Sequence, residues 1–437
     1  MSSILTKNFK ILLAKQVYDL LDLSANSYLP TSRKSYVYAV IGKQIAWTNE
    51  NSPPAVLDDD NSINDYYRDA IFAKQLSFDD ASFVVSRINW ETGTVYNTYE
   101  SNTNFYVLTT KDQVFKCLDN NFGEQSTDEP EITLSSTSLE EPYIETGDGY
   151  KWKYMYSLTS TQKRKFLTDD WLPVTYNKFV RNSAIGGSID IVKIQNSGNS
   201  YANGPTQSII TVTGDGSGAV LKANVANGNI QNIIIQERGS DYTFATLKIT
   251  DTASGTNANA IVAISPVDGH GYDPVYELGA TNILFSVYFE NNESSTLPTD
   301  NDYRRVFLVR NPYAYGTTTL ASTASYSLYT KLNVSPGTGS YIVDETVFQG
   351  TQETPTFSAK VISFNSVSNE LYLNNIVGTP QTNFVIAGSE SEANRVINSI
   401  ENPEMQLYSG KVLYIINNAP ITRNNSQTEQ IRFILSF

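Results

Sequence analysis

The chain contains a single histidine, His270, and histidine is the side chain that most often transfers protons or binds metals near neutral pH. It lies in the segment Asp268-Gly-His-Gly-Tyr-Asp273, so that one carboxylate stands on each side of the imidazole. A catalytic zinc usually takes several histidine ligands, and a glycine-rich segment of this kind is adequately explained as a linker. We therefore expect no metal at His270 and no enzymatic role for it.

Other sequence patterns of catalysis give no specific signal. A Ser-His-Asp triad would have to use His270, and the sequence has no G-x-S-x-G motif, P-loop or dinucleotide fingerprint. The acidic run Asp58–Asp60 lacks the spacing of a calcium loop. A glycosidase needs two carboxylates across a cleft, and nothing selects two among 45 acidic residues. We expect no cofactor.

The most regular stretch of the chain, residues 144–158, predicts the strand around which the fold is organised. A turn at Thr146–Gly149 precedes it, and lysines and a methionine alternate with aromatic residues along it, a period of two that is typical of a strand. The aromatic row consists of Tyr150, Trp152, Tyr154 and Tyr156. We interpret these four rings as structural core of a main sheet; the alternative is a row that stacks on a ligand.

Two amphipathic helices are predicted, at residues 6–23 and 63–76, from apolar residues at helical spacing. The second helix carries Tyr66 and Tyr67 near a loop tip, and we take these two rings as the candidate dimer interface. Strands are predicted between and after the helices, at 35–41, 82–90, 105–109, 114–118, 283–290, 304–309, 411–416 and 431–437.

Two regions differ from the rest of the chain in amino-acid composition and in the spacing of turn residues. Residues 183–265 are poor in aromatics and repeat a motif, with Gly198-Asn-Ser-Tyr201 recurring as Gly239-Ser-Asp-Tyr242, which indicates a duplicated β unit. Residues 314–403 hold short strands separated by turn residues, as in a small barrel. The predicted fold is mainly β: a layered β-sandwich core from 1–182, 266–313 and 404–437, a few peripheral α-helices and two inserted small β domains.

Composition and charge restrict the possible partners. The 437 residues are 40% hydrophobic and 12% aromatic, which is enough for several cores, and tyrosine is more common than phenylalanine. The formal charge of −14 argues against a nucleic-acid or anionic membrane surface. No apolar run is long enough to cross a bilayer, the N-terminal residues show no signal-peptide core, and Cys117 has no second cysteine to pair with.

Several segments resemble the baseplate wedge protein of T4-like contractile-tailed bacteriophages, of the gene-product-eight type. They occur in the order expected for that family and cover a little over half of the chain, leaving out 183–265 and 314–403. The segments are 85–90 (VSRINW), 114–119 (VFKCLD), 145–156 (ETGDGYKWKYMY), 283–289 (ILFSVYF), 304–312 (RRVFLVRNP), 409–421 (SGKVLYIINNAPI) and 427–437 (QTEQIRFILSF).

The resemblance implies a structural role. It implies a layered β-sandwich core, a homodimer in each wedge, contacts with other baseplate wedge subunits and no catalytic residues to carry over. We accordingly expect a non-enzymatic virion protein of the tail baseplate, assembled in the host cytoplasm, that binds neither nucleic acid nor membrane. The alternative that the residues leave open is a carbohydrate-binding or carbohydrate-active tail protein, in which the inserted modules bind the glycan.

Overall fold

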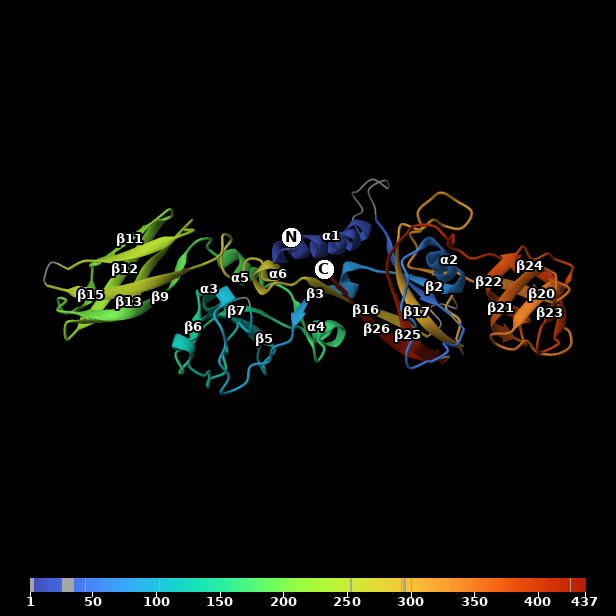
Figure 1. Cartoon of the computed structure of the whole chain (residues 1–437), viewed down its shortest axis with the longest axis horizontal. Coiled ribbons are helices and arrows are strands. Elements are labelled where there is room, and N and C mark those ends of the chain that lie inside the picture. The colour runs from blue at the N-terminus through green and yellow to red at the C-terminus, as the bar shows by residue number, and fades with distance from the viewer. Residues whose placement is uncertain are drawn as a thin grey trace. The chain divides into compact units, whose positions relative to one another are not determined.

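A computed structural model describes residues 4–25, 35–43, 45–101, 103–251, 254–291, 293, 296–299, 301–424 and 426–437 (Figure 1). The chain is 46% strand and 14% helix, with several antiparallel sheets and few helices, so the predicted mainly β fold class is confirmed. It divides into two compact units. Unit one comprises Met1–Ala14, Ser82–Leu284 and Ser436–Phe437, and unit two comprises Lys15–Ala81 and Phe285–Leu435.

The predicted core residues 1–182, 266–313 and 404–437 are shared between these two units. The domain boundaries drawn from the sequence therefore stay a prediction. Two helices, α1 (Lys7–Ala25) and α2 (Asp60–Asp69), occur where the sequence indicates helices, but the second of them is shorter than expected.

Unit one is built on an antiparallel sheet in the order β4-β5-β7-β6. Strand β5 pairs with β7 so that Cys117 lies opposite Trp152. The strands are β4 (Tyr106–Leu108), β5 (Gln113–Asp119), β6 (Ile144–Glu145) and β7 (Lys151–Ser157), and β3 (Ala81–Ser86) pairs separately with β8 (Trp171–Val174). Short helices surround the sheet: α3 (Ser136–Glu140), α4 (Ser160–Phe166), α5 (Lys178–Ser183) and α6 (Pro274–Leu278).

Strands β9 to β15 form the module that contains the repeated motif (Figure 1). β9 (Ile189–Asn199) pairs with β15 (Thr256–Ile264), and β11 (Ile210–Gly214) pairs with β14 (Ala245–Ile249). The third sheet has the order β10-β12-β13, with β10 (Gly204–Gln207), β12 (Ser217–Ala226) and β13 (Asn229–Ser240).

The repeated Gly-x-x-Tyr motif makes the same turn twice. Gly198 and Gly239 have positive φ values of 62° and 65°, and a Cβ on either would lie 2.6 or 2.8 Å from the ring of the tyrosine three residues later. Both tyrosines, Tyr201 and Tyr242, are buried. Glycine is required at each copy because the backbone is left-handed and the ring packs directly on it.

Unit two contains a five-stranded antiparallel sheet in the order β18-β2-β1-β17-β25. Its strands are β1 (Val37–Gly42), β2 (Ala70–Gln75), β17 (Asn301–Arg310), β18 (Ser325–Ser327) and β25 (Lys411–Arg423). β16 (Asn282–Glu290) and β26 (Thr428–Ser436) are neighbouring strands whose Phe285 and Phe433 rings stack.

A closed six-stranded barrel lies within residues 314–403 of unit two (Figure 1). Its strand order is β19-β22-β21-β20-β23-β24. The strands are β19 (Thr330–Val334), β20 (Thr346–Gly350), β21 (Pro355–Asn365), β22 (Glu370–Gly378), β23 (Val385–Gly388) and β24 (Asn394–Glu401). Aliphatic residues such as Leu332, Leu371 and Ile397 fill its interior and are fully buried.

The predicted helix at 63–76 is wrong beyond Asp69. The chain turns into strand β2 at Ala70, and that strand pairs with both β1 and β18. The apolar run Ala70–Ala73 fits a helical stripe and a buried strand equally well, and pairing in the sheet decides between them. Because the helix ends early, Tyr66 and Tyr67 lie at its last turn, and both rings are buried.

Candidate functional site

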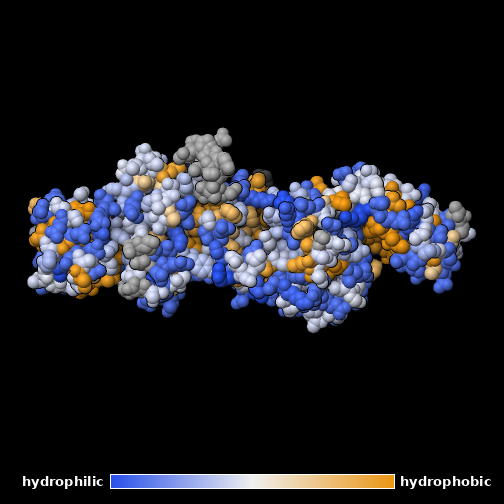
Figure 2. Space-filling view, turned by 180° about the vertical axis from the view of Figure 1, so that it is seen from behind, coloured by the Kyte–Doolittle hydropathy of each residue, from blue (hydrophilic) through white to orange (hydrophobic). Residues whose placement is uncertain are grey.

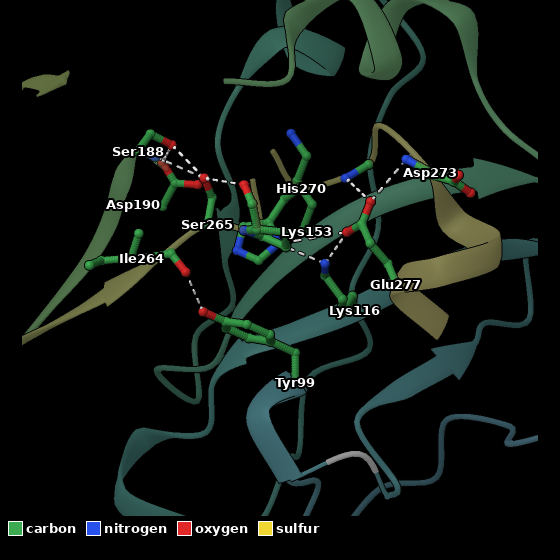
Figure 3. Close-up of polar contacts among 12 residues, drawn as sticks. Tyr99, Lys116, Lys153, Ser188, Asp190, Ile264, Ser265, His270, Asp273 and Glu277 are labelled. Carbon is green, nitrogen blue, oxygen red and sulfur yellow. Dashed lines mark hydrogen bonds and ion pairs between the residues drawn. The ribbon is translucent and has the colours of Figure 1, made fainter. Parts of the chain in front are cut away.

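Three ionisable side chains meet in the interior of unit one, and we call them the buried cluster: Lys116 on β5, His270 in the loop before α6, and Glu277 on α6 (Figure 3). Lys116 Nζ lies 2.6 Å from His270 Nδ1 and forms an ion pair with Glu277 Oε2. The side chains of these residues are only 1%, 4% and 7% exposed, respectively. Water therefore has little access to the cluster.

Aromatic and backbone groups complete the surroundings of the cluster. The Tyr99 ring meets the His270 ring edge-on at 4.8 Å, and Lys116 Nζ lies 5.4 Å from the centroid of Tyr99. Glu277 Oε1 accepts hydrogen bonds from the backbone N–H groups of Gly271 at 2.8 Å and Asp273 at 3.3 Å. The carboxylate is thus held at both oxygens.

The glycines beside His270 allow the loop to turn into the interior of unit one, so the segment is not a linker. Gly271 has a φ of +87°, and a Cβ there would lie 2.3 Å from a Val180 methyl group. Asp273 then caps α6 by accepting from the N–H groups of Val275 and Tyr276, and Pro274 occupies the first turn. Our reading of the segment as a linker is wrong, because its imidazole is buried.

The electrostatics of the cluster follow from burial and from the charges of Lys116 and Glu277. Burial lowers the pKa of His270 to about 4, and the nearby Lys116 charge acts in the same direction, so the imidazole is neutral near pH 7. Burial by itself would raise the pKa of Glu277, but the nearby Lys116 charge outweighs it and lowers that pKa to about 2. Burial also lowers the pKa of Lys116.

Beside the cluster, hydrogen bonds hold the two ends of the β9–β15 module (Figure 3). Tyr99 donates to the carbonyl of Ile264 at 2.7 Å, and the Ser265 hydroxyl accepts from the N–H of Ser188 at 2.9 Å. Asp190 accepts from the Ser188 hydroxyl at 2.7 Å. The buried cluster therefore lies where the module joins the sheet that carries Lys116.

Acid should destabilise unit one through His270. The folded chain disfavours the imidazolium between pH 6.5 and about 4 whereas the unfolded chain binds the proton, so stability falls as the pH is lowered through that range, by about 3 kcal/mol. While its carboxylate is free, Glu277 acts in the same direction at lower pH, from about 4.5 to about 2. Denaturant unfolding at several pH values measures this slope.

The variant His270→Gln is the control for this slope. It should unfold with a flatter dependence between pH 6.5 and 4, because His270 is the only histidine in the chain. Asp69 in unit two, whose pKa burial raises to about 6, acts in the opposite direction and is common to both proteins. Equal slopes in the two proteins would contradict a buried neutral imidazole.

An exposed group on the same unit, which we call the Arg181 patch, consists of Tyr176, Phe179, Arg181 and Tyr272. The Arg181 guanidinium stacks on two rings, 5.2 Å from the centroid of Tyr176 and 4.8 Å from that of Tyr272. The three aromatic residues are 57%, 54% and 37% exposed. Tyrosine, phenylalanine and arginine are enriched at the centres of protein interfaces, so this composition is typical of a binding surface.

The buried cluster positions part of the Arg181 patch. Tyr272 lies between Gly271 and Asp273, the two residues whose N–H groups bind Glu277. Arg181 and Phe179 project from α5, whose Val180 is fully buried against the same loop. The exposed rings are therefore attached to a rigid base. Figure 2 shows that hydrophobic residues on the face it draws gather in separate patches among polar ones.

The four rings of the predicted aromatic row are buried in β7 and the turn before it. Tyr150 stacks on Trp152 at 5.4 Å, and Tyr96 meets Trp152 edge-on at 5.6 Å. Tyr154 is 3% exposed and packs on Phe115, while the Tyr156 hydroxyl donates to the carbonyl of Pro173 at 3.0 Å. These positions agree with a packing role and offer no surface for a ligand to stack on.

The two candidate dimer residues are not on the surface of the monomer. Tyr66 and Tyr67 are 6% and 5% exposed; Arg305 stacks on Tyr66 at 4.1 Å, and the Tyr67 hydroxyl donates to the carbonyl of Ser409 at 2.7 Å. The expectation that these rings stand exposed at a loop tip is wrong, because both pack within unit two. The dimer itself stays a prediction.

Sequence reasoning missed Lys116 and Glu277. Lys116 is a lysine in the otherwise apolar run Val114–Leu118, and Glu277 follows the helix-start signal Asp273-Pro274. Of the two carboxylates that flank His270 in the sequence, that of Asp273 caps α6. Within the described ranges, no group of three or more His, Cys, Asp or Glu side chains is arranged to hold a metal ion.

Comparison of the sequence with protein-family models and with curated proteins returned no match. Of the helices that the structure describes, none is both long and apolar enough to cross a membrane.

Proposed function

We propose that this chain is a structural subunit of the baseplate wedge of a contractile bacteriophage tail and acts through protein–protein interfaces during virion assembly. The segments that resemble the wedge family support the baseplate assignment. The Arg181 patch carries the interface part of the proposal, because it exposes three aromatic residues and a stacked arginine on a rigid base. Its proposed partners are a second copy of the chain and other wedge subunits.

The buried cluster supports a structural rather than an enzymatic role. Its lysine, imidazole and carboxylate contact one another, and each is less than a tenth exposed, so a substrate from solution would have no path to them without opening the unit. A charge cluster of this kind fixes the geometry of the loop and helix around it.

A variant of the Arg181 patch should block assembly without unfolding the chain. Arg181→Ala combined with Tyr272→Ala removes the stack from an exposed surface, so we expect at least a tenfold loss of the subunit from purified particles with little change in melting temperature. Complementation of a phage lacking the wild-type gene, followed by blotting of particles, measures this. Phe244→Ala, at an exposed ring in the β9–β15 module, serves as the matched control. Normal incorporation of the double variant would contradict the role of the patch.

The purified chain should form a dimer. The wedge resemblance implies two copies, and an isolated subunit must cover part of its exposed apolar surface. Light scattering at micromolar concentration should give twice the 48.5 kDa chain mass. A mass of 48.5 kDa throughout a concentration series would refute the homodimer.

A carbohydrate-binding role is the second candidate, and one cavity favours it. Unit two has a cavity of about 260 Å³ lined by the half-exposed rings of Tyr315 and Tyr408, together with Arg68, Asn402 and Gln406. Aromatic rings and amides are suitable contacts for a sugar, although the volume is below the about 300–1,000 Å³ of typical ligand pockets. A glycan array separates the two functions: binding that Tyr408→Ala abolishes would favour the second.

A further inference from the structure

We propose that Lys116 and Glu277 form an intramolecular isopeptide bond, with His270 as the group that relays the proton. The bond would be made once, by the folded chain on itself, and would covalently connect β5 to α6. It goes beyond the proposed assembly role and does not depend on it.

The arrangement of groups is that of an acyl transfer. The nucleophile, Lys116 Nζ, contacts the Glu277 carboxylate directly. A base, His270 Nδ1, lies 2.6 Å from the same nitrogen, and this imidazole is neutral near pH 7 and can accept a proton. The N–H groups of Gly271 and Asp273 donate to Glu277 Oε1, where the negative charge of a tetrahedral intermediate would develop.

The reaction balances without any further reactant. Lys116 enters as an ammonium and Glu277 as a carboxylate. Lys116 Nζ first gives one proton to His270 Nδ1, and the resulting amine attacks Cδ of Glu277; a C–N bond forms, and the Cδ–Oε2 bond breaks with its electron pair remaining on Oε2. Nζ loses two protons, one of them by way of His270 Nδ1, and both end on Oε2, which leaves as water. The product is a neutral secondary amide.

Burial favours this product over the ion pair. Lys116 and Glu277 are 1% and 7% exposed, and an ammonium and a carboxylate held away from water carry a desolvation penalty that an amide does not. The groups are already in contact, and positioned groups of this kind react with effective molarities of about 10⁵–10⁸ M. Departure of the water into solvent makes the step hard to reverse in a dry interior.

The chain offers an internal comparison in unit two. Lys43 is also buried and lies 2.7 Å from Asp302, but the Asp302 side chain is 26% exposed and also binds Arg304 at 2.6 Å. The only histidine of the chain is elsewhere. This second pair has a nucleophile and a carboxylate without the imidazole or the dry surroundings, so it should remain ionic.

Mass spectrometry of the denatured full-length protein tests the proposal. We expect a mass lower than the sequence mass by one water, and a tryptic map in which Lys116 is uncleaved and joined to the peptide containing Glu277, while Lys43 is unmodified. Lys116→Gln should restore the full sequence mass. Glu277→Gln should have a mass lower than that of its own sequence by one ammonia, because the glutamine amide nitrogen then leaves in place of water. His270→Gln should slow the reaction at least tenfold, so that freshly made protein is mostly unlinked.

Dehydration at an aspartate–glycine pair would also remove one water, and the chain contains such pairs, including Asp148-Gly149 and Asp215-Gly216. The resulting cyclic imide hydrolyses in mild alkali, whereas an isopeptide bond survives and makes the denatured chain migrate faster in a gel than Lys116→Gln. A wild-type chain with the full sequence mass overturns the proposal whether or not the variants fold. A water loss that maps elsewhere overturns it as well.

Discussion

Glu277→Leu should lower the free energy of unfolding of unit one by about 3–5 kcal/mol, the largest single effect that we expect. Leucine has a similar size, but it leaves the Lys116 ammonium buried without its carboxylate. It also removes the acceptor of the Gly271 and Asp273 N–H groups. Urea unfolding followed by circular dichroism should show a transition of unit one at a lower urea concentration than in the wild-type chain.

Two variants identify the cause of that loss. Combining Glu277→Leu with Lys116→Met removes the unpaired charge and should recover the part of the loss that the buried ammonium causes, whereas both variants lack the proposed covalent bond. Glu131→Leu breaks the exposed Lys111–Glu131 pair, whose side chains are 56% and 53% exposed, and should change stability by less than about 1 kcal/mol. If Glu277→Leu costs no more than Glu131→Leu, Lys116 and Glu277 do not stabilise unit one, either as an ion pair or as a linked pair.

Trp152→Ala should cost a similar amount, about 3–5 kcal/mol, through a different mechanism. The indole is fully buried and lies between the rings of Tyr150 and Tyr96, so its removal leaves a cavity in the interior of unit one. The melting temperature of unit one should fall clearly in a calorimetric scan.

Trp152→Phe and Phe122→Ala complete this test. The indole N–H of Trp152 is buried without an acceptor among the described residues, so Trp152→Phe loses ring volume but no hydrogen bond and should cost less than Trp152→Ala. Phe122 is 75% exposed, and its truncation should change little. An unchanged melting curve for Trp152→Ala would mean that the aromatic row is exposed in solution, and the ligand-stacking alternative would then be favoured.

Features that depend on the pattern of a few neighbouring residues could be predicted from the sequence. Features that depend on pairing between strands far apart in the sequence could not. Alternation along β7 predicted the strand that carries Trp152, Tyr154 and Tyr156, and the repeated Gly-x-x-Tyr motif marked two equivalent turns, because both signals lie within a few residues. The apolar run after Asp69 suits a helix or a strand, and only the neighbouring strands β1 and β18 settle it.

The candidate site could not be predicted from the sequence for the same reason. Lys116 is separated from His270 by 154 residues and from Glu277 by 161, so no local pattern connects them. The sequence did show unusual residues at two of the three positions, a lysine within an apolar strand and a histidine between glycines. Such residues become informative only when the fold brings them together. The Arg181 patch likewise joins Tyr176 and Tyr272, which lie on opposite sides of the β9–β15 module in the sequence.

The proposed location in a tail baseplate can be tested by electron microscopy of phage particles labelled with gold-conjugated antibody against this chain. A wedge subunit should place the label in a ring at the end of the tail that contacts the host, on particles with extended sheaths and on particles with contracted ones. Label confined to heads or fibre tips, or particles that carry none of the chain, would contradict the proposed function.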